Sequence, residues 1–192
     1  MKRSVICMTL FTVVIWAQTN PWKDKFIAAM NDSNGVVISV EILQKQFESS
    51  LVERGTIEIF KEKHYILDTA SQTVYVTGDT VQTWNKVAGQ LIIDQIIEGE
   101  FSLFNLITGD FKDVNFGTPL VGVSLVAMDF DIPMMGYKGK ITLSKKGQPK
   151  VIKIIYGPNQ NVSLTVKKYR TGKLKLYHSF NPIAAEVIDL RE

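Results

Sequence analysis

The sequence predicts a mainly β protein with an α-helical lid: a single curled antiparallel sheet (a half-open β-barrel) covered by short helices. Two observations lead to this fold class. After residue 35, apolar and polar residues alternate over many short runs, and turn-forming residue pairs separate these runs. Two other segments, near residues 21–30 and 101–109, have apolar residues at helical spacing instead. A long antiparallel sheet tends to curl, and the two helices would cover one of its faces.

The N-terminus has the features of a cleaved export signal. Lys2 and Arg3 form a positive start, and the run Val5–Trp16 is almost wholly apolar. The run has about a dozen residues, which is short of the ~20 that a membrane-spanning helix needs. Ala17 is a small residue before polar Gln18, so we expect cleavage between them. The alternative is a buried N-terminal strand. We therefore expect a signal peptide over 1–17 and one mature domain over 18–192, soluble in the periplasm.

Composition excludes several classes of protein. Cys7, the only cysteine, lies within the expected signal, so the mature domain would have no thiol, disulfide or cysteine metal site. Removal of the signal takes away two of the 22 basic residues and none of the 19 acidic ones, which leaves a net charge of +1. This charge implies no nucleic-acid partner. Lys138 to Lys175 nevertheless contains eleven basic and no acidic residues. This stretch is either a basic surface for an acidic partner or anionic lipid head groups, or the outward faces of amphipathic strands.

The first helix is predicted to begin at Asn20-Pro21, because Asn is a good N-cap and Pro fits the first helical position. Asn34-Gly35 would close this helix. Its apolar stripe comprises Trp22, Phe26, Ile27 and Met30. The second helical segment would end near Gly109-Asp110, and its apolar residues are Phe101, Leu103, Phe104, Leu106, Ile107 and Phe111.

The strands are recognised by their alternation. Clear examples are Ile38, Val40 and Ile42, then Ile57 and Ile59, and later Ile152, Ile154 and Tyr156, and Val162, Leu164 and Val166. The turns between strands are expected at Thr77-Gly78-Asp79, Ala88-Gly89, Lys146-Gly147, Gly157-Pro158-Asn159 and Thr171-Gly172. Many short strands joined by tight turns indicate a meandering antiparallel sheet.

Catalytic chemistry finds no support in the sequence. The two histidines, His64 and His178, have no metal-ligand neighbour at a suitable spacing and belong to no nucleophile motif. Asp129-Phe130-Asp131 resembles a metal-binding pair, but we expect it to end a strand over 122–128. No glycine-rich loop that could hold a phosphate is present. We therefore expect a protein that is not an enzyme and has no catalytic residue, metal or cofactor.

Three short motifs, in order along the chain, resemble the LolA family of periplasmic outer-membrane lipoprotein carriers. Ile42-Leu43-Gln44 is similar to the end of the family's first strand. Leu106–Asp110 is similar to its leucine-rich stretch, which ends in Gly-Asp. Phe180-Asn181-Pro182 followed by Glu186–Asp189 resembles its closing F-x-P…E-V-I-D strand. The resemblance extends through nearly all of residues 18–192.

The resemblance implies a set of lid and lipid-binding residues. Counting from Gly55 places Lys61 where the family has a lid-tethering arginine, Glu62 at its proline and Tyr65 at an aromatic residue near the cavity mouth. Leu67 occupies the next inward position, often Trp in the family. Lysine cannot form the planar fork of arginine, so its grip on backbone carbonyls would be weaker. The helices would add Trp22, Phe26, Phe101, Phe104, Leu106 and Ile107, facing a common cavity.

The resemblance also implies a function. Such a carrier shields the acyl chains of lipoproteins and shuttles them from the inner membrane towards the outer membrane. Its partners would be acylated lipoproteins, an inner-membrane lipoprotein-releasing transporter and an outer-membrane acceptor, and it would act as a monomer. Releasing one long acyl chain into water costs on the order of 10 kcal/mol, so a carrier is needed. The alternatives are a periplasmic lipid- or polyisoprenoid-binding module that carries no protein, and a structural envelope protein whose helices plug the sheet.

Overall fold

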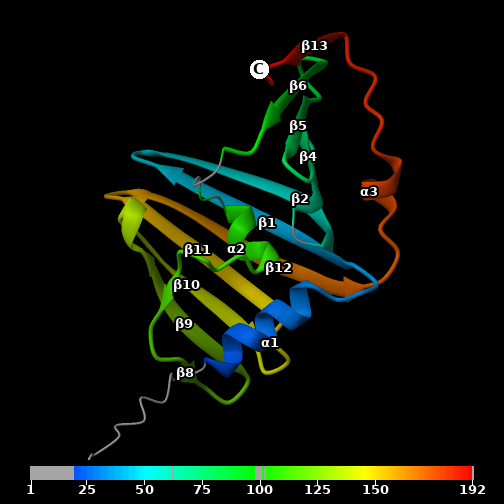
Figure 1. The fold of residues 1–192 in the computed structure, drawn as a ribbon. Helices are drawn as coiled ribbons and strands as arrows, with labels where there is room; N and C mark the ends of the chain where they lie inside the picture. The colour runs from blue at the N-terminus through cyan, green and yellow to red at the C-terminus, as the bar shows by residue number, and fades with distance from the viewer. Residues whose placement is uncertain (1–19, 62, 98–100, 102, 192) are drawn as a thin grey trace, which may run out of the picture.

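The protein folds as one large sheet with helices on both of its faces (Figure 1). The computed structural model describes residues 20–61, 63–97, 101 and 103–191. The predicted signal peptide and Glu62 lie outside these residues. None of the described helices has the length and hydropathy that a membrane crossing requires.

The elements follow one another in a simple order. The helical elements are α1 (Pro21–Met30), α2 (Leu103–Thr108), the 3-10 turn η1 (Pro133–Met135) and α3 (Lys175–Ser179). The first half of the chain supplies β1 (Val36–Gln46), β2 (Ser49–Lys61), β3 (His64–Thr69), β4 (Gln72–Thr77), β5 (Thr80–Asn85) and β6 (Gln90–Gln95). The second half supplies β7 (Asn115–Phe116), β8 (Leu120–Val121), β9 (Leu125–Ile132), β10 (Tyr137–Ser144), β11 (Pro149–Gly157), β12 (Gln160–Thr171) and β13 (Glu186–Asp189).

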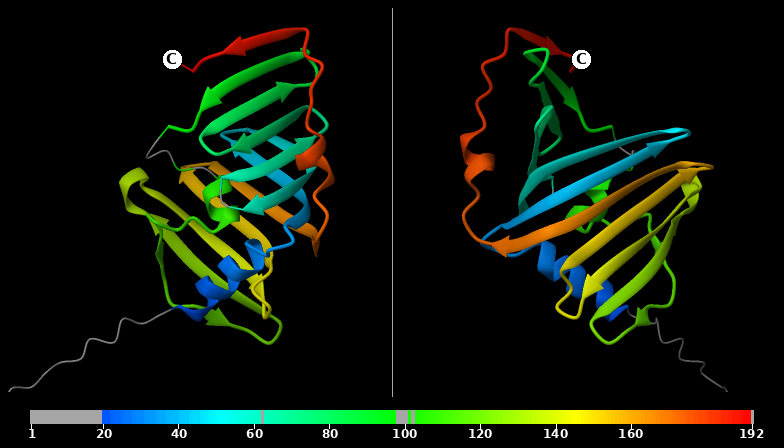
Figure 2. Two further views of the ribbon diagram at one scale, coloured as in Figure 1. Left: turned by 45° about the vertical axis from the view of Figure 1, so that its right-hand side comes forward. Right: turned by 180° about the vertical axis from the view of Figure 1, so that it is seen from behind.

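Two antiparallel meanders form the sheet, and a central strand pair joins them. β1 pairs with β2 on one side and with β12 on the other, along its whole length in both cases. The strand order is β13-β6-β5-β4-β3-β2-β1-β12-β11-β10-β9-β7, with β8 also on β9. The predicted single curled sheet is therefore confirmed, and it stays open between β13 and β7. β13 is parallel to β6, which differs from the all-antiparallel sheet expected. After β12 the chain crosses the outside of the sheet and reaches β6 from the same direction (Figure 2).

The concave face of the sheet is covered by α1 and α2 (Figure 2). Asn20 caps α1 as predicted, since its Oδ1 accepts hydrogen bonds from the backbone N–H groups of Trp22 and Lys23. The helix ends at Met30, before Asn34-Gly35. Asn31 terminates it, because the Asn31 side chain donates to the carbonyls of Ile27 and Thr108, both at 3.1 Å. These bonds also tie α1 to the end of α2.

One continuous apolar core fills the space between the helices and the sheet. The helices contribute Phe26, Met30, Leu106 and Ile107, all fully buried. The sheet contributes alternate residues from strands of both meanders, among them Ile38, Ile57, Ile59, Val76, Met128, Ile132, Ile141, Leu143, Ile152 and Leu164. The period of two in the sequence therefore marks the face that the helices cover.

Asp129-Phe130-Asp131 does not end a strand, as was expected, but lies inside β9. Phe130 and Ile132 are buried, whereas Asp129 is exposed and pairs with Lys140 at 3.3 Å. The two carboxylates therefore sit on the outer face of a strand that continues past them. Within the described ranges, no group of three or more His, Cys, Asp or Glu is placed to hold a metal ion.

Candidate functional site

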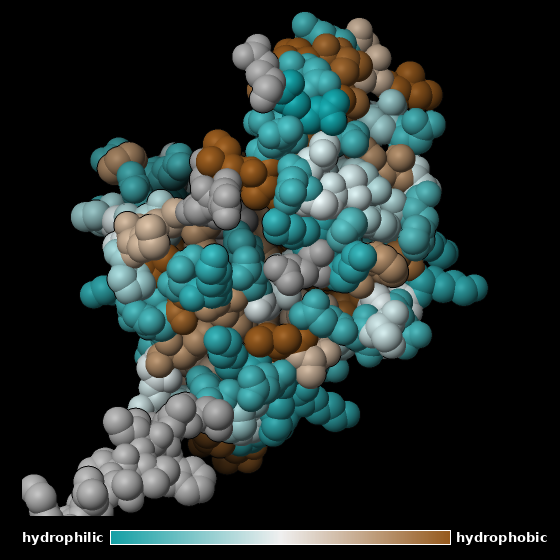
Figure 3. Space-filling model, in the orientation of Figure 1, coloured by the Kyte–Doolittle hydropathy of each residue, from teal (hydrophilic) through white to brown (hydrophobic). Residues whose placement is uncertain are grey.

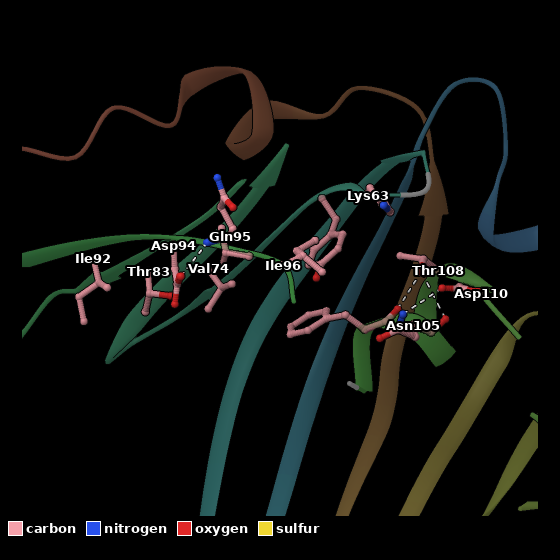
Figure 4. Close-up of a pocket in the computed structure, with 13 residues that line it drawn as sticks. Lys63, Val74, Thr83, Ile92, Asp94, Gln95, Ile96, Asn105, Thr108 and Asp110 are labelled. Atoms are coloured by element: carbon pink, nitrogen blue, oxygen red, sulfur yellow. Dashed lines mark hydrogen bonds between the residues drawn. The ribbon is translucent and has the colours of Figure 1, made fainter. Parts of the chain in front are cut away.

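A groove with a volume of about 440 Å³ lies between α2 and strands β3–β6 (Figure 4). Ile92, Thr83 and Val74 lie on the strands at one side, and Asn105, Thr108 and Asp110 lie at the α2 side. Its apolar lining comprises Tyr65, Val74, Val81, Ile92, Ile96 and Phe104. Its polar lining comprises Lys63, Thr83, Asp94, Gln95, Asn105, Thr108 and Asp110. The volume lies within the roughly 300–1,000 Å³ typical of small-ligand sites.

An aromatic pair joins the sheet to α2 inside this groove. The rings of Tyr65 and Phe104 stack with their centroids 4.7 Å apart and their planes 17° apart. Tyr65 is only 8% exposed, and this burial raises the pKa of its hydroxyl above the usual range. Tyr65 therefore stays neutral at physiological pH. A movement of α2 away from β3 would expose both rings and lengthen the apolar surface of the groove.

Polar groups lie on both sides of the groove, on strands β5 and β6 and also where α2 ends. Asn105 donates a side-chain hydrogen bond to Asp110 at 3.0 Å, and the Thr108 hydroxyl donates to the Phe104 carbonyl at 2.8 Å. Lys63 enters the lining from the turn before β3 and pairs with Asp79 at 2.9 Å. The groove thus combines apolar side chains from the strands and Phe104 with polar groups from both of its sides. Such a groove suits an amphipathic ligand with one apolar chain.

The predicted lipid-facing residues separate into two groups. Tyr65 and Phe104 line the groove. Phe26, Leu106 and Ile107 are fully buried and Leu67 nearly so, and they form the core behind the groove. Phe101 is partly buried and also packs against this core. The apolar stripes of the two helices are therefore largely used to close the concave face.

Trp22 lies apart from the groove. It is half-buried at the start of α1, and its ring contacts two ammonium groups, that of Lys25 at 4.0 Å and that of Lys145 at 5.5 Å from the ring centroid. It lines a separate hollow with Phe116 and Val121. The prediction that one cavity would collect Trp22 and the α2 residues is therefore not met in this conformation.

Lys61 also lies outside the groove. Its side chain is exposed, and its ammonium lies 5.7 Å from the centroid of the Phe60 ring. Among the described residues, no hydrogen bond joins Lys61 to a carbonyl of residues 101–109. The register of β2 and β3 shifts between Ile59 and Lys61, so counting along the strand does not carry Lys61 to the concave face. Lys63 is the lysine that reaches the groove.

Sequence reasoning missed the far wall of the groove. This wall comprises Val74 on β4, Val81 on β5, Ile92 on β6 and Ile96 just after β6. One sequence pattern could have found this wall. Val74 and Val76 alternate with Tyr75 just before the predicted turn at Gly78, which indicates a strand with one apolar face. The groove is therefore built from the first meander and α2 rather than from both helices.

Comparison with known proteins gives similarity in fold but none in sequence. No family model matches the chain, and no curated protein matches it. An uncharacterized conserved protein from Thermus thermophilus matches with a TM-score of 0.58 at 12% identity, covering 88% of this chain and 97% of that one. The expected fold class, a curled sheet covered by short helices, is confirmed. At this identity the likeness concerns the fold alone.

Two further solved structures match over most of the chain. A LolA superfamily protein from Nitrosomonas europaea has a TM-score of 0.46 at 10% identity, covering 84% of this chain and 96% of that one. The Mycobacterium tuberculosis lipoprotein LppX has a TM-score of 0.42 at 12% identity, covering 81% and 96% respectively.

Proposed function

We propose that this protein is a periplasmic carrier that shields the acyl chains of lipoproteins and shuttles them from the inner membrane towards the outer membrane. The observation that carries the proposal is the groove of about 440 Å³ between α2 and β3–β6, with Tyr65 and Phe104 stacked across it. No residue of this groove is needed for chemistry in such a role, and the protein acts without catalysis.

The physical basis is an exchange of contacts. Each methylene that leaves water for an apolar groove gains ~0.8 kcal/mol. When α2 moves aside, the protein loses the Tyr65–Phe104 stack and gains contacts between these rings and the acyl chain. The cost of opening keeps binding weaker than the gross contact energy, so the cargo is released to an acceptor that binds more tightly. The polar residues Asn105 and Asp110 line the groove beside α2, where the hydrated polypeptide part of a lipoprotein would leave it.

The partners and the compartment belong to the same proposal. An inner-membrane lipoprotein-releasing transporter would load the carrier, and an outer-membrane acceptor would unload it. The export signal over 1–17 would place the mature chain in the periplasm, where it would act as a monomer. Intact-mass measurement of the exported protein should give a first residue at or near Gln18. Retention of Met1, or an acylated cysteine, would contradict this part.

A second function is favoured by the size of the groove. One groove of about 440 Å³ favours one apolar chain, whereas a lipoprotein carries several. A periplasmic lipid- or polyisoprenoid-binding module that carries no protein would need only this one groove. The two functions differ in what the protein holds when it is isolated from the periplasm.

Native mass spectrometry of protein purified from the periplasm tests both functions. An added mass equal to an acylated polypeptide supports the carrier, and the mass of a free lipid supports the binding module. The Phe104→Ala variant should lose the added mass, whereas Phe60→Ala, which removes a ring from the opposite face of β2, should keep it. A protein that holds no apolar molecule and binds no apolar probe would contradict both functions.

A further inference from the structure

An exposed apolar hairpin protrudes at the end of the molecule where α1 begins. It consists of residues 117–125, and the Gly122 N–H donates to the Leu125 carbonyl at 2.9 Å to close it. Its aliphatic side chains are largely exposed: Leu120 64%, Val121 56%, Val123 101% and Leu125 43%. Single exposed aliphatic residues are ordinary, but a contiguous group on one protruding hairpin indicates an interaction surface.

The apolar surface continues onto the start of α1. Pro21, Trp22, Pro119 and Val121 line a hollow of about 310 Å³ between the hairpin and the helix. Figure 1 shows β8 beside the first turn of α1 at this end, and Figure 3 shows brown side chains there, at the bottom of the molecule. The indole of Trp22 is therefore part of the same surface as the hairpin.

Positive charge surrounds this apolar surface. The ammonium groups of Lys25 and Lys145 lie over the Trp22 ring at 4.0 and 5.5 Å from its centroid. The turn that carries Lys145 packs on α1 so closely that a Cβ on Gly147 would overlap the Lys25 carbonyl oxygen. Lys23 and Lys146 add two charges, and Asp24 on the same helix removes one. These five side chains leave a net charge of +3 at this end.

We propose that this end binds the surface of a bilayer that contains anionic lipids. The docking face comprises the hairpin 117–125, Trp22, and the lysines Lys23, Lys25, Lys145 and Lys146. The aliphatic tip enters the boundary of the acyl chains, the indole lies at the level of the head groups, and the ammonium groups pair with lipid phosphates. Aliphatic, indole and ammonium groups are the side chains that the acyl boundary, the head-group level and the lipid phosphates favour.

The position of the N-terminus supports a bilayer as the partner. The apolar run at positions 5–16 is joined to the folded domain at Asn20, which lines the hollow beside the hairpin. While an export signal is held in the membrane, this end of the domain is the one that faces the lipid. The docking face shares no residue with the groove at Tyr65 and Phe104, so this proposal stands independently of the carrier function.

Vesicle sedimentation with the exported mature protein tests the docking face. The protein should bind vesicles of mixed phosphatidylglycerol and phosphatidylcholine and should bind vesicles of phosphatidylcholine alone at least tenfold more weakly. Val123→Asp should weaken binding to the mixed vesicles tenfold or more, because the charge cannot enter the acyl boundary. Lys25→Gln and Lys145→Gln should each weaken it roughly fivefold.

Ile183→Asp is the matched control. Ile183 is 93% exposed, like Val123, but lies in the segment between α3 and β13. This variant should bind vesicles as the unaltered protein does, and both variants should still bind an apolar probe in the groove. Equal binding to the two kinds of vesicle, no binding to either, or undiminished binding by Val123→Asp would overturn the proposal. So would sedimentation velocity that shows a dimer lost in Val123→Asp, since the hairpin would then bind a second copy.

Discussion

At the scale of single residues, the groove depends on the contact between Tyr65 and Phe104. Phe104→Ala should weaken the binding of an apolar fluorescent probe roughly tenfold, because the variant removes aromatic surface worth ~1.5–3 kcal/mol when buried. A titration of probe fluorescence measures this change. Phe60→Ala is the control, since Phe60 stacks on Tyr177 at 6.0 Å, away from the groove. Equal probe affinity in the two variants would mean that the ligand lies elsewhere.

Tyr65 also makes stability depend on pH in the alkaline range. Burial raises its pKa above the ordinary value of 10.0, so the unfolded chain releases this proton at a lower pH than the folded protein does. The stabilisation from the neutral, buried hydroxyl is complete below pH 10 and is lost as the pH rises further. Tyr65→Phe should therefore show a shallower fall in the free energy of unfolding between pH 9 and pH 11. Urea unfolding at each pH measures it, and identical slopes would contradict the assignment to Tyr65.

Sequence reasoning placed some residues of the site and misplaced others for a local reason. The count from Gly55 leads to Tyr65, and Tyr65 does line the groove. The same count leads to Lys61, which does not. The register shift between Ile59 and Lys61 changes which face the following side chain takes. An irregularity of this kind leaves no mark in the residue types, so alternation alone assigns such a position wrongly.

At the scale of elements, the structure contains one helix that the spacing of apolar residues did not predict. α3 has the sequence Lys-Leu-Tyr-His-Ser and no apolar stripe. Contacts with the sheet hold α3 in place. Glu58 of β2, only 2% exposed, accepts a hydrogen bond from the Tyr177 N–H at 3.0 Å. The Tyr177 hydroxyl lies 3.0 Å from His64 Nδ1. α3 therefore owes its place to the strands beneath it, whereas α1 and α2 follow from their own sequences.

Glu58→Ala should loosen α3. The Tyr177 N–H would lose its acceptor in a partly buried place, at a cost of about 1 kcal/mol. Hydrogen exchange at this amide should become several-fold faster, while Glu58→Gln, which keeps an acceptor oxygen, should stay close to the unaltered protein. Glu41→Ala is a control for charge, since Glu41 forms surface ion pairs with Arg54 and Lys167, both at 3.0 Å. Unchanged exchange in Glu58→Ala would show that the aromatic contacts of α3 hold it alone.

At the scale of the whole molecule, the sequence predicted one curled sheet but not its strand order. Each meander follows from neighbouring strands and the turns between them, such as the turn at Gly78 with its φ of 63°. The pairing of β1 with β12 and of β13 with β6 joins segments far apart in the chain. Local patterns do not specify such pairs. The curl itself follows from the number of strands, and so it was predictable.

β13 protects one edge of the sheet. It covers β6 through parallel pairing from Glu186–Gln90 to Asp189–Ile93, and the Leu190 N–H also donates to the Ile93 carbonyl at 2.8 Å. Truncation before Glu186 should expose the edge of β6 and promote association, which light scattering and size-exclusion chromatography measure. Glu186→Ala, which loses only the side-chain bond from Gln90 at 2.8 Å, should remain monomeric. A truncated protein that elutes as the monomer with unchanged scattering would contradict this protective role.

The central pairing of β1 with β12 also has a consequence for when the protein folds. Val36 faces Thr171 across this pair, so β1 has one unpaired edge until almost the whole chain has been made. A topology with such distant contacts folds slowly, because the loop must close before the contacts form. The first meander alone cannot enclose the core, since many of the buried apolar residues come from strands after residue 125. Late closure would therefore keep the newly made chain unfolded while the export signal proposed over residues 1–17 acts.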